Sequence, residues 1–151
     1  LGNGYHIMQS KIALGSGGIF GKGYMEGTQS HLNFLPEMQT DFIFTMLGEE
    51  FGFIGTLTLL IIYASLIIIS IRLALKSRSL FSKYLSLGVS NVFFIYIFVN
   101  IGMVTGLLPV VGVPLPFISY GGSSMLAVMF GFGLLMNCYI NRNTIIEKTN
   151  Y

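Results

Sequence analysis

Three long stretches of the chain contain hydrophobic and small polar residues but no charged side chain. They cover residues 51–71, 84–108 and 115–140. Each stretch is longer than the roughly 20 residues that a helix needs to cross about 30 Å of hydrocarbon. The pattern therefore predicts an all-α polytopic membrane protein, with transmembrane helices that we place at 41–71, 84–108 and 117–140.

The composition agrees with this pattern. Hydrophobic residues make up 53% of the chain and charged residues only 9%, whereas a typical soluble domain has roughly 25% charged residues. The net charge of +2 is too small to indicate a nucleic-acid partner. The single cysteine, Cys138, excludes an internal disulfide and a cysteine-based metal site. Because the chain opens on Leu1 without a signal-peptide pattern, we expect it to be the C-terminal portion of a longer membrane protein.

Basic residues predict which ends of the helices face the cytoplasm. The loop 72–83 carries basic residues and no acid, and the tail 141–151 is also basic on balance. The positive-inside rule places both segments in the cytoplasm. Because three spans must alternate, residues 1–40 form a large extracellular loop and residues 109–116 form a short one.

The extracellular loop begins with a pattern typical of an interfacial helix. Around HIMQSKIAL, the side chains of Tyr5, Met8 and Ile12 fall on one side of such a helix, which the following GSGGIFGKG would break. These glycines form either a flexible or tightly turning loop or, with Lys11 or Lys22, a phosphate cradle. No predicted strand precedes them, so they are not a dinucleotide-binding fingerprint.

Four of the six acidic residues lie in NFLPEMQTDFIFTMLGEEFG, at the mouth of the first apolar stretch. Pro36 suits the first turn of a helix. A helix that began there would bring four polar residues near one face: Glu37, Asp41, Thr45 and Glu49. Alternatively, Thr40 is the N-cap and Asp41 opens the helix. A carboxylate between a polar loop and an apolar span is a functional candidate when it faces a bundle interior or a cavity, so Asp41 is our candidate catalytic or binding residue.

The third stretch begins with PLPFISYGGSS, which gathers small residues at one end of a helix. Ser119, Gly121, Gly122 and Ser123 would expose backbone N–H groups there, and a helix N-terminus attracts anions. The alternative is close helix packing, which small residues also permit. For the similarly spaced glycines of GMVTG and GEEFG we prefer packing.

Two long segments carry a resemblance to a known family. GTQSHLNFLPEMQTDFIFTMLGEEFG resembles the large external loop and the following span of the SEDS family (FtsW, RodA and SpoVE; shape, elongation, division and sporulation). VNIGMVTGLLPVVGVPLPFISYGGSSML resembles the last two spans, and its GVPLPFISYGGSS looks like the RodA elongation branch. The resemblance implies a bundle of about ten membrane-spanning helices, of which this chain would supply the large extracellular loop and the final three helices.

The resemblance also implies a function. Its members are peptidoglycan glycosyltransferases in the bacterial cytoplasmic membrane, and they polymerise lipid II, an undecaprenyl-pyrophosphate-linked disaccharide peptide, at the outer membrane face. Their partners are a class B penicillin-binding protein, which is a transpeptidase, and the surrounding membrane lipids. The essential aspartate of the family motif PExHTDFIF falls on Asp41. The motif's histidine is Gln39 here, so that position is not an indispensable acid or base if this protein is active.

A single carboxylate suits this chemistry. A sugar hydroxyl is a poor nucleophile, and a general base accelerates its reaction by roughly 10²–10⁴-fold, so we expect Asp41 to deprotonate the acceptor hydroxyl. The pyrophosphate leaving group needs charge neutralisation more than a proton, so the second carboxylate of hydrolytic glycosidases is not required. We expect substrate contacts from a wider set of residues: Gln29, Ser30, His31, Glu37, Lys11, Ser119, Gly121, Gly122 and Ser123.

Other expectations concern the cofactor and the competing functions. No protein metal site is predicted, although a divalent cation (Mg²⁺ or Mn²⁺) would neutralise pyrophosphate charge, and we expect the 151 residues to be inactive alone. A lipid II flippase is one alternative function, because acidic residues and glycine-broken spans also suit transport. A non-catalytic scaffold that recruits the transpeptidase is the other.

Overall fold

The computed structural model describes residues 3–24, 26–27 and 40–143, and these residues form helices, turns and loops without a strand. The helices are α1 (Asn3–Ser16), α3 (Ile43–Leu75), α4 (Leu80–Val104) and α5 (Gly122–Ile140). The last three are long and apolar enough to cross a membrane. The all-α class that the hydrophobic pattern predicts is therefore confirmed.

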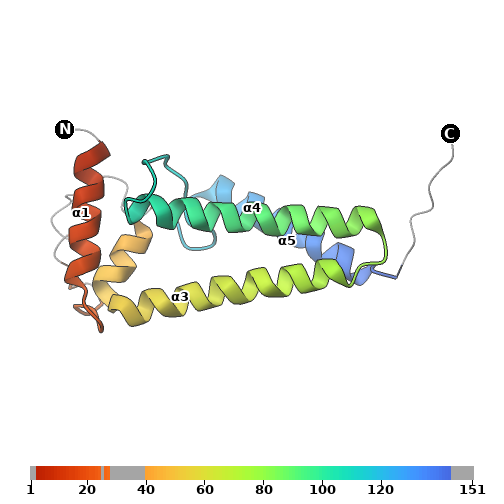
Figure 1. Ribbon diagram of the computed structural model, residues 1–151, viewed down its shortest axis with the longest axis horizontal. Coiled ribbons are helices and arrows are strands. Elements are labelled where there is room, and N and C mark those ends of the chain that lie inside the picture. Colours follow the sequence, from red (N-terminus) through yellow and green to blue (C-terminus); the bar gives the residue numbers. More distant parts are fainter. Residues whose placement is uncertain (1–2, 25, 28–39, 144–151) are drawn as a thin grey trace.

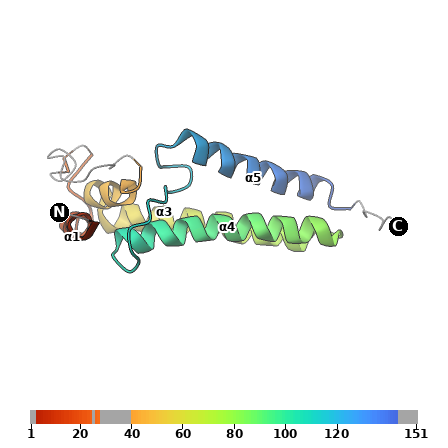
Figure 2. The same ribbon diagram turned by 90° about the horizontal axis from the view of Figure 1, so that it is seen from above.

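The three long helices lie side by side, and α1 crosses one end of them (Figure 1). Figure 2 shows α5 beside the α3–α4 pair. We call the end that holds α1, Asp41 and residues 109–121 the α1 end. At the opposite end, the Arg78 N–H donates to the Arg142 carbonyl at 3.0 Å, so the basic loop and the start of the basic tail meet there. The cytoplasmic location of that end stays a prediction.

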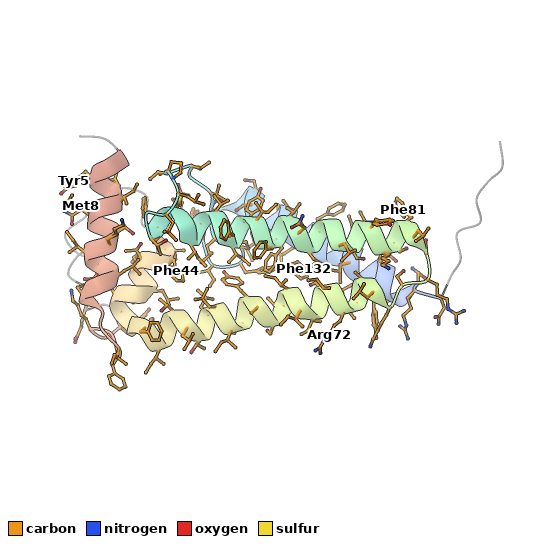
Figure 3. All side chains as sticks on the ribbon, viewed as in Figure 1. Tyr5, Met8, Phe44, Arg72, Phe81 and Phe132 are labelled. Atoms are coloured by element: carbon orange, nitrogen blue, oxygen red, sulfur yellow. The ribbon has the colours of Figure 1, made fainter. Side chains whose placement is uncertain are left out.

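Aromatic side chains fill the space where the three long helices meet. The ring centroid of Phe93 on α4 lies 5.9 Å from that of Tyr63 on α3 and 5.0 Å from that of Phe132 on α5. Both are edge-to-face pairs, the arrangement that aromatic rings favour. Figure 3 shows Phe44 and Phe132 on the inward side of the bundle, and both belong to or pack against the buried core.

The first long helix starts later than the sequence indicates. α3 begins at Ile43 with Phe42 as its N-cap, so Thr40 is not its N-cap and Asp41 does not open it, and that prediction was wrong; Pro36 lies outside the described residues. Asp41 precedes the helix and does not share a helical face with later residues. Residues 40–42 form a turn. The carbonyls of Thr40 and Asp41 accept hydrogen bonds from side chains in other parts of the chain, and the Phe42 carbonyl accepts the first backbone bonds of α3.

A break divides α3 into two parts at Gly52. This residue has φ +65° and ψ −159°, a conformation that glycine adopts readily and other residues do not. We call residues 43–51 the outer segment of α3. The remaining part, 53–75, rises roughly 34 Å at about 1.5 Å per residue, which is enough to cross the hydrocarbon of a bilayer without the outer segment.

The helix expected from residue 117 begins instead at Gly122. Pro114 and Pro116 lack an N–H donor, and Phe117 has φ +66°, so residues 114–121 turn before the helix starts. The predicted spans 41–71, 84–108 and 117–140 refer to a bilayer, and their borders stay predictions.

α1 confirms the helix predicted around HIMQSKIAL. Tyr5, Met8 and Ile12 are all exposed, and Figure 3 shows Tyr5 and Met8 on the side of α1 that points away from the long helices. Ser10 and Ala13 are buried against the bundle. Leu14 also packs against the buried core, so the side of α1 that packs carries Ser10, Ala13 and Leu14, and the stripe of Tyr5, Met8 and Ile12 lies on another side.

Candidate active site

Asp41 lies at the α1 end, directly before the outer segment of α3, and is only 9% exposed. The loop 109–116 passes beside its carboxylate. A Cβ added to Gly112 would stand 3.2 Å from Asp41 Oδ2, and Gly112 has φ +72°. Glycine at this position therefore both permits the turn and leaves room for the carboxylate.

Two side chains from distant parts of the sequence hold the main chain around Asp41. Asn100 of α4 donates from Nδ2 to the Asp41 carbonyl at 3.0 Å and to the Val113 carbonyl at 2.6 Å. Ser119 donates from Oγ to the Thr40 carbonyl at 2.5 Å. Because Asn100 is fully buried and Ser119 is 8% exposed, water competes little for these bonds. They tie the residues around Asp41 to α4 and to the loop before α5.

The loop 109–121 is itself fixed by buried hydrogen bonds. The Leu115 N–H donates to Ser119 Oγ at 2.7 Å, and the Tyr63 hydroxyl of α3 donates to the Pro116 carbonyl at 2.6 Å. Leu115 and Tyr63 are both buried. The surroundings of Asp41 are thus a fixed arrangement built from α3, α4 and this loop.

A groove of about 430 Å³ opens beside this arrangement. Its lining includes Ile43, which begins α3, and residues of the loop before α5: Ser119, Tyr120, Gly121 and Gly122. The structure therefore brings three of the expected substrate contacts, Ser119, Gly121 and Gly122, to one groove, which Ile43, two positions after Asp41 in the sequence, also lines. Ser123 is exposed in the first turn of α5.

Other expected substrate contacts are placed differently. Lys11 lies over Gly106 just after the end of α4, since a Cβ at Gly106 would stand 2.6 Å from Lys11 Nζ. A cation there suits the negative end of the helix dipole. Five residues lie outside the described part of the chain, namely Gln29, Ser30, His31, Glu37 and Gln39. Gln39 is only a departure from the family motif, and the substrate-binding roles of Lys11, Gln29, Ser30, His31 and Glu37 stay predictions.

The glycine loop, residues 17–23, packs against α3. The N–H groups of Lys22 and Gly23 donate to the carbonyls of Glu49 and Glu50 at 3.0 and 3.1 Å. Lys22 Nζ lies 2.8 Å from Glu49 Oε1. These bonds favour the tight-turn interpretation over the phosphate cradle, because groups that a phosphate would need are bonded to α3. The close approach of Gly17 to Gly48 agrees with the packing role proposed for GEEFG.

Sequence reasoning missed Asn100, although a signal was present. Asn100 is an amide in the uncharged stretch 84–108, where a polar group is costly unless it is bonded. No metal site emerges from the described residues, among which no group of three or more His, Cys, Asp or Glu side chains could hold an ion.

The comparison with protein families decides the relationship. The model of the FtsW/RodA/SpoVE family, described as a cell cycle protein, matches residues 1–144. The chain belongs to this family. Its membership agrees with the resemblance of the two long segments and, together with the three apolar helices, it shows a multi-pass membrane protein.

Curated family members are similar over almost the whole chain. The peptidoglycan glycosyltransferase MrdB of Escherichia coli K12 is 52% identical over 148 residues, which cover 98% of this chain and 40% of that protein. The peptidoglycan glycosyltransferase RodA of Treponema pallidum is 44% identical over 134 residues, 89% of this chain and 31% of that protein. Stage V sporulation protein E of Bacillus subtilis is 44% identical over 137 residues, 91% of this chain and 37% of that protein. The chain thus spans about two-fifths or less of these relatives.

A solved structure also shares the fold. It comes from a peptidoglycan synthase complex described as coordinating polymerization and crosslinking. One of its chains matches with a TM-score of 0.72 and 31% identity, over 91% of this chain and 38% of that one. The similarity confirms that the described helices follow the arrangement of a SEDS bundle.

Proposed function

We propose that the full-length protein is a peptidoglycan glycosyltransferase of the elongation branch and that Asp41 is its general base. Family membership and the names of the relatives support the reaction class. The GVPLPFISYGGSS segment supports the branch. The single observation that carries the role of Asp41 is its placement: a buried carboxylate two positions before Ile43, which lines the groove, with its main chain held by Asn100 and its Oδ2 against Gly112.

The proposed step needs one base and one leaving group. Ionised Asp41 accepts the proton of the acceptor sugar's 4-hydroxyl as that oxygen bonds to the anomeric carbon of the donor. The bond from this carbon to the lipid pyrophosphate breaks, and the pyrophosphate leaves with the electron pair. An in-line displacement of this kind converts an α-linked donor into a β-linked product. A base placed this way contributes roughly 10²–10⁴-fold to the rate.

Fixed geometry matters because a base acts only within hydrogen-bonding distance of the proton. The bonds from Asn100 and Ser119 to the carbonyls of Asp41 and Thr40 hold the backbone in place, so the carboxylate does not have to be ordered during the reaction. Such pre-positioning supplies part of an enzyme's rate enhancement.

The described residues include a candidate base, but they offer no cation placed to neutralise the charge of the pyrophosphate. Lys22 is paired with Glu49, and Lys11 lies at the end of α4. We therefore propose that pyrophosphate charge is neutralised by residues outside this chain or by a divalent cation, Mg²⁺ or Mn²⁺. The family also supports a class B penicillin-binding protein as the partner and the outer face of the bacterial cytoplasmic membrane as the location of the α1 end.

The test is polymerisation of purified lipid II by the full-length protein in detergent, where no bilayer is available for transport. We expect wild type to form glycan strands and Asp41→Asn to lose about 10²–10⁴-fold in rate. Glu50→Gln removes a half-buried carboxylate at the other end of the outer segment and is the matched control. Full activity of Asp41→Asn would contradict the proposal. If well-folded wild type makes no polymer but moves lipid II across the membrane of vesicles, the flippase is favoured. If it does neither, the scaffold is favoured.

A further inference from the structure

The break in α3 leaves backbone groups on both sides of Gly52 without helical partners. A helix that stops exposes its last carbonyls, and a helix that starts exposes its first N–H groups. At this break both kinds of group lie at the α1 end, between the outer segment and the long part of the helix. Something other than the helix must bond them, because buried backbone groups rarely stay unpaired.

The glycine loop supplies these missing partners on both sides. It donates from Lys22 and Gly23 to two carbonyls in the last turn before the break, those of Glu49 and Glu50. It also accepts from the first N–H groups after the break: Phe53 N–H donates to the Gly18 carbonyl at 2.9 Å and Ile54 N–H to the Ile19 carbonyl at 3.2 Å. The loop therefore joins the two parts of α3 and sets the angle between them.

Small residues make this contact close enough. A Cβ at Gly21 would overlap the carbonyl of Glu50, and a Cβ at Gly52 would overlap the backbone N of Gly21. The backbones of the loop and of α3 thus approach each other directly, which only glycine permits on both sides.

One side-chain pair reinforces the backbone bonds. Glu49 is 1% exposed and Lys22 is 28% exposed, and their charged atoms lie 2.8 Å apart. A buried carboxylate is costly unless it is paired. The pair lies at the inner end of the outer segment, and the bonds from Asn100 and Ser119 hold the residues just before its other end. Between them, Thr45 Oγ1 and Ser10 Oγ of α1 are 2.8 Å apart.

We propose that the Glu49–Lys22 pair is a positioning element for Asp41, an inference that rests on the proposed function. The outer segment is a short rigid helix of roughly 14 Å from Gly52 to Ile43 at about 1.5 Å per residue. A tilt of about 5° at the break moves its far end by roughly 1 Å. A shift of that size in a reacting group can cost about 100-fold in rate. The pair does not touch the groove, so it acts on kcat and not on lipid II binding.

The experiment measures kcat and KM for lipid II polymerisation by the full-length protein, together with its apparent Tm. We expect Glu49→Gln and Lys22→Met to lower kcat by at least tenfold and to change KM by less than threefold. Lys22→Arg keeps the charge pair and should retain kcat within threefold. Glu50→Gln removes the neighbouring carboxylate without touching the pair and should behave as wild type.

Asp41→Asn, measured alongside, separates the two proposals. If it abolishes polymerisation while Glu49→Gln and Lys22→Met keep wild-type kcat, the positioning proposal is wrong and the role of Asp41 stands. If Asp41→Asn polymerises normally, the proposed function is wrong. A rise in KM with unchanged kcat in Lys22→Met would also overturn the positioning proposal, because it would assign Lys22 to substrate binding.

A milder variant covers the case in which the broken pair prevents folding. Glu49→Asp keeps the charge but withdraws the carboxylate by one methylene, so we expect a folded protein with at least fivefold lower kcat and unchanged KM. Suppose that Glu49→Gln and Lys22→Met both fail to fold, and that folded Glu49→Asp has the kcat of wild type. The pair would then serve stability alone, and the positioning proposal would be wrong.

Discussion

Replacement of Asn100 tests how firmly the fold holds the candidate base. Asn100 is fully buried, and its two amide hydrogens serve two different carbonyls, those of Asp41 and Val113. Its Oδ1 has no hydrogen-bond partner among the described residues. The side chain therefore acts as a double donor, and we expect any variant that cannot donate to both carbonyls to be less stable than wild type.

The magnitude follows from these contacts. Asn100→Leu has a similar volume and leaves a buried carbonyl (Asp41) and a part-buried one (Val113) without this donor, at about 1–3 kcal/mol each. It also removes the buried Oδ1, which returns about as much as one of these losses, so we expect a net loss of about 1–3 kcal/mol in the free energy of unfolding. Asn100→Asp keeps the shape but turns an oxygen toward the two carbonyls. An ionised form leaves an uncompensated buried charge at about 3–5 kcal/mol, and a protonated carboxyl has only one hydrogen to donate.

The assay compares the two variants of the full-length protein by unfolding in mixed detergent micelles and by lipid II polymerisation. We expect Asn100→Asp to be less stable than Asn100→Leu, although Asp resembles Asn more closely in shape. Both should lose polymerase activity by more than their loss of folded protein explains. If Asn100→Asp is as stable and active as wild type, the double-donor role is wrong.

Two further predictions concern the loop beside Asp41. Gly112→Ala places a side chain on a left-handed backbone conformation, at a cost of about 1–2 kcal/mol, and directs it toward the Asp41 carboxylate. We therefore expect the polymerisation rate to fall about tenfold or more. Gly88→Ala is the control: a Cβ there meets nothing within 4 Å, so this variant should be as stable as wild type or more stable by up to about 1 kcal/mol. Equal behaviour of the two alanine variants would contradict this. Tyr63→Phe removes the bond to the Pro116 carbonyl and should lower the unfolding free energy by about 0.5–1.5 kcal/mol, and an unchanged unfolding curve would mean that this bond does not hold the loop.

The sequence reveals the helices well because their signal is local and strong. Three uncharged stretches predict three long helices, and the glycines after HIMQSKIAL predict the end of α1. Helix starts are less predictable, because they depend on backbone groups bonded from elsewhere. α3 starts after Asp41 where Asn100 and Ser119 bond the preceding carbonyls, and nothing in the residues around Pro36 indicates those partners.

The residues of the candidate site also differ in how far the sequence predicts them. Asp41 stands out because a carboxylate beside an apolar stretch is rare, and the family motif points to the same residue. Asn100, Gly112 and Tyr63 act through contacts that arise only when distant segments meet, so the sequence alone does not single them out. The buried pairing of Glu49 with Lys22 supports a role that needs no contact with substrate.

The separation in sequence between Asp41 and its supports has a consequence for biosynthesis. The carbonyls of Thr40 and Asp41 receive hydrogens from residues 79 and 59 positions downstream. A ribosome that has released only the first long helix into the translocon has therefore not yet produced the groups that hold this aspartate. On the proposed function, a nascent chain acquires an ordered base only after nearly all of these residues are inserted, so truncated products would not consume cell-wall precursors.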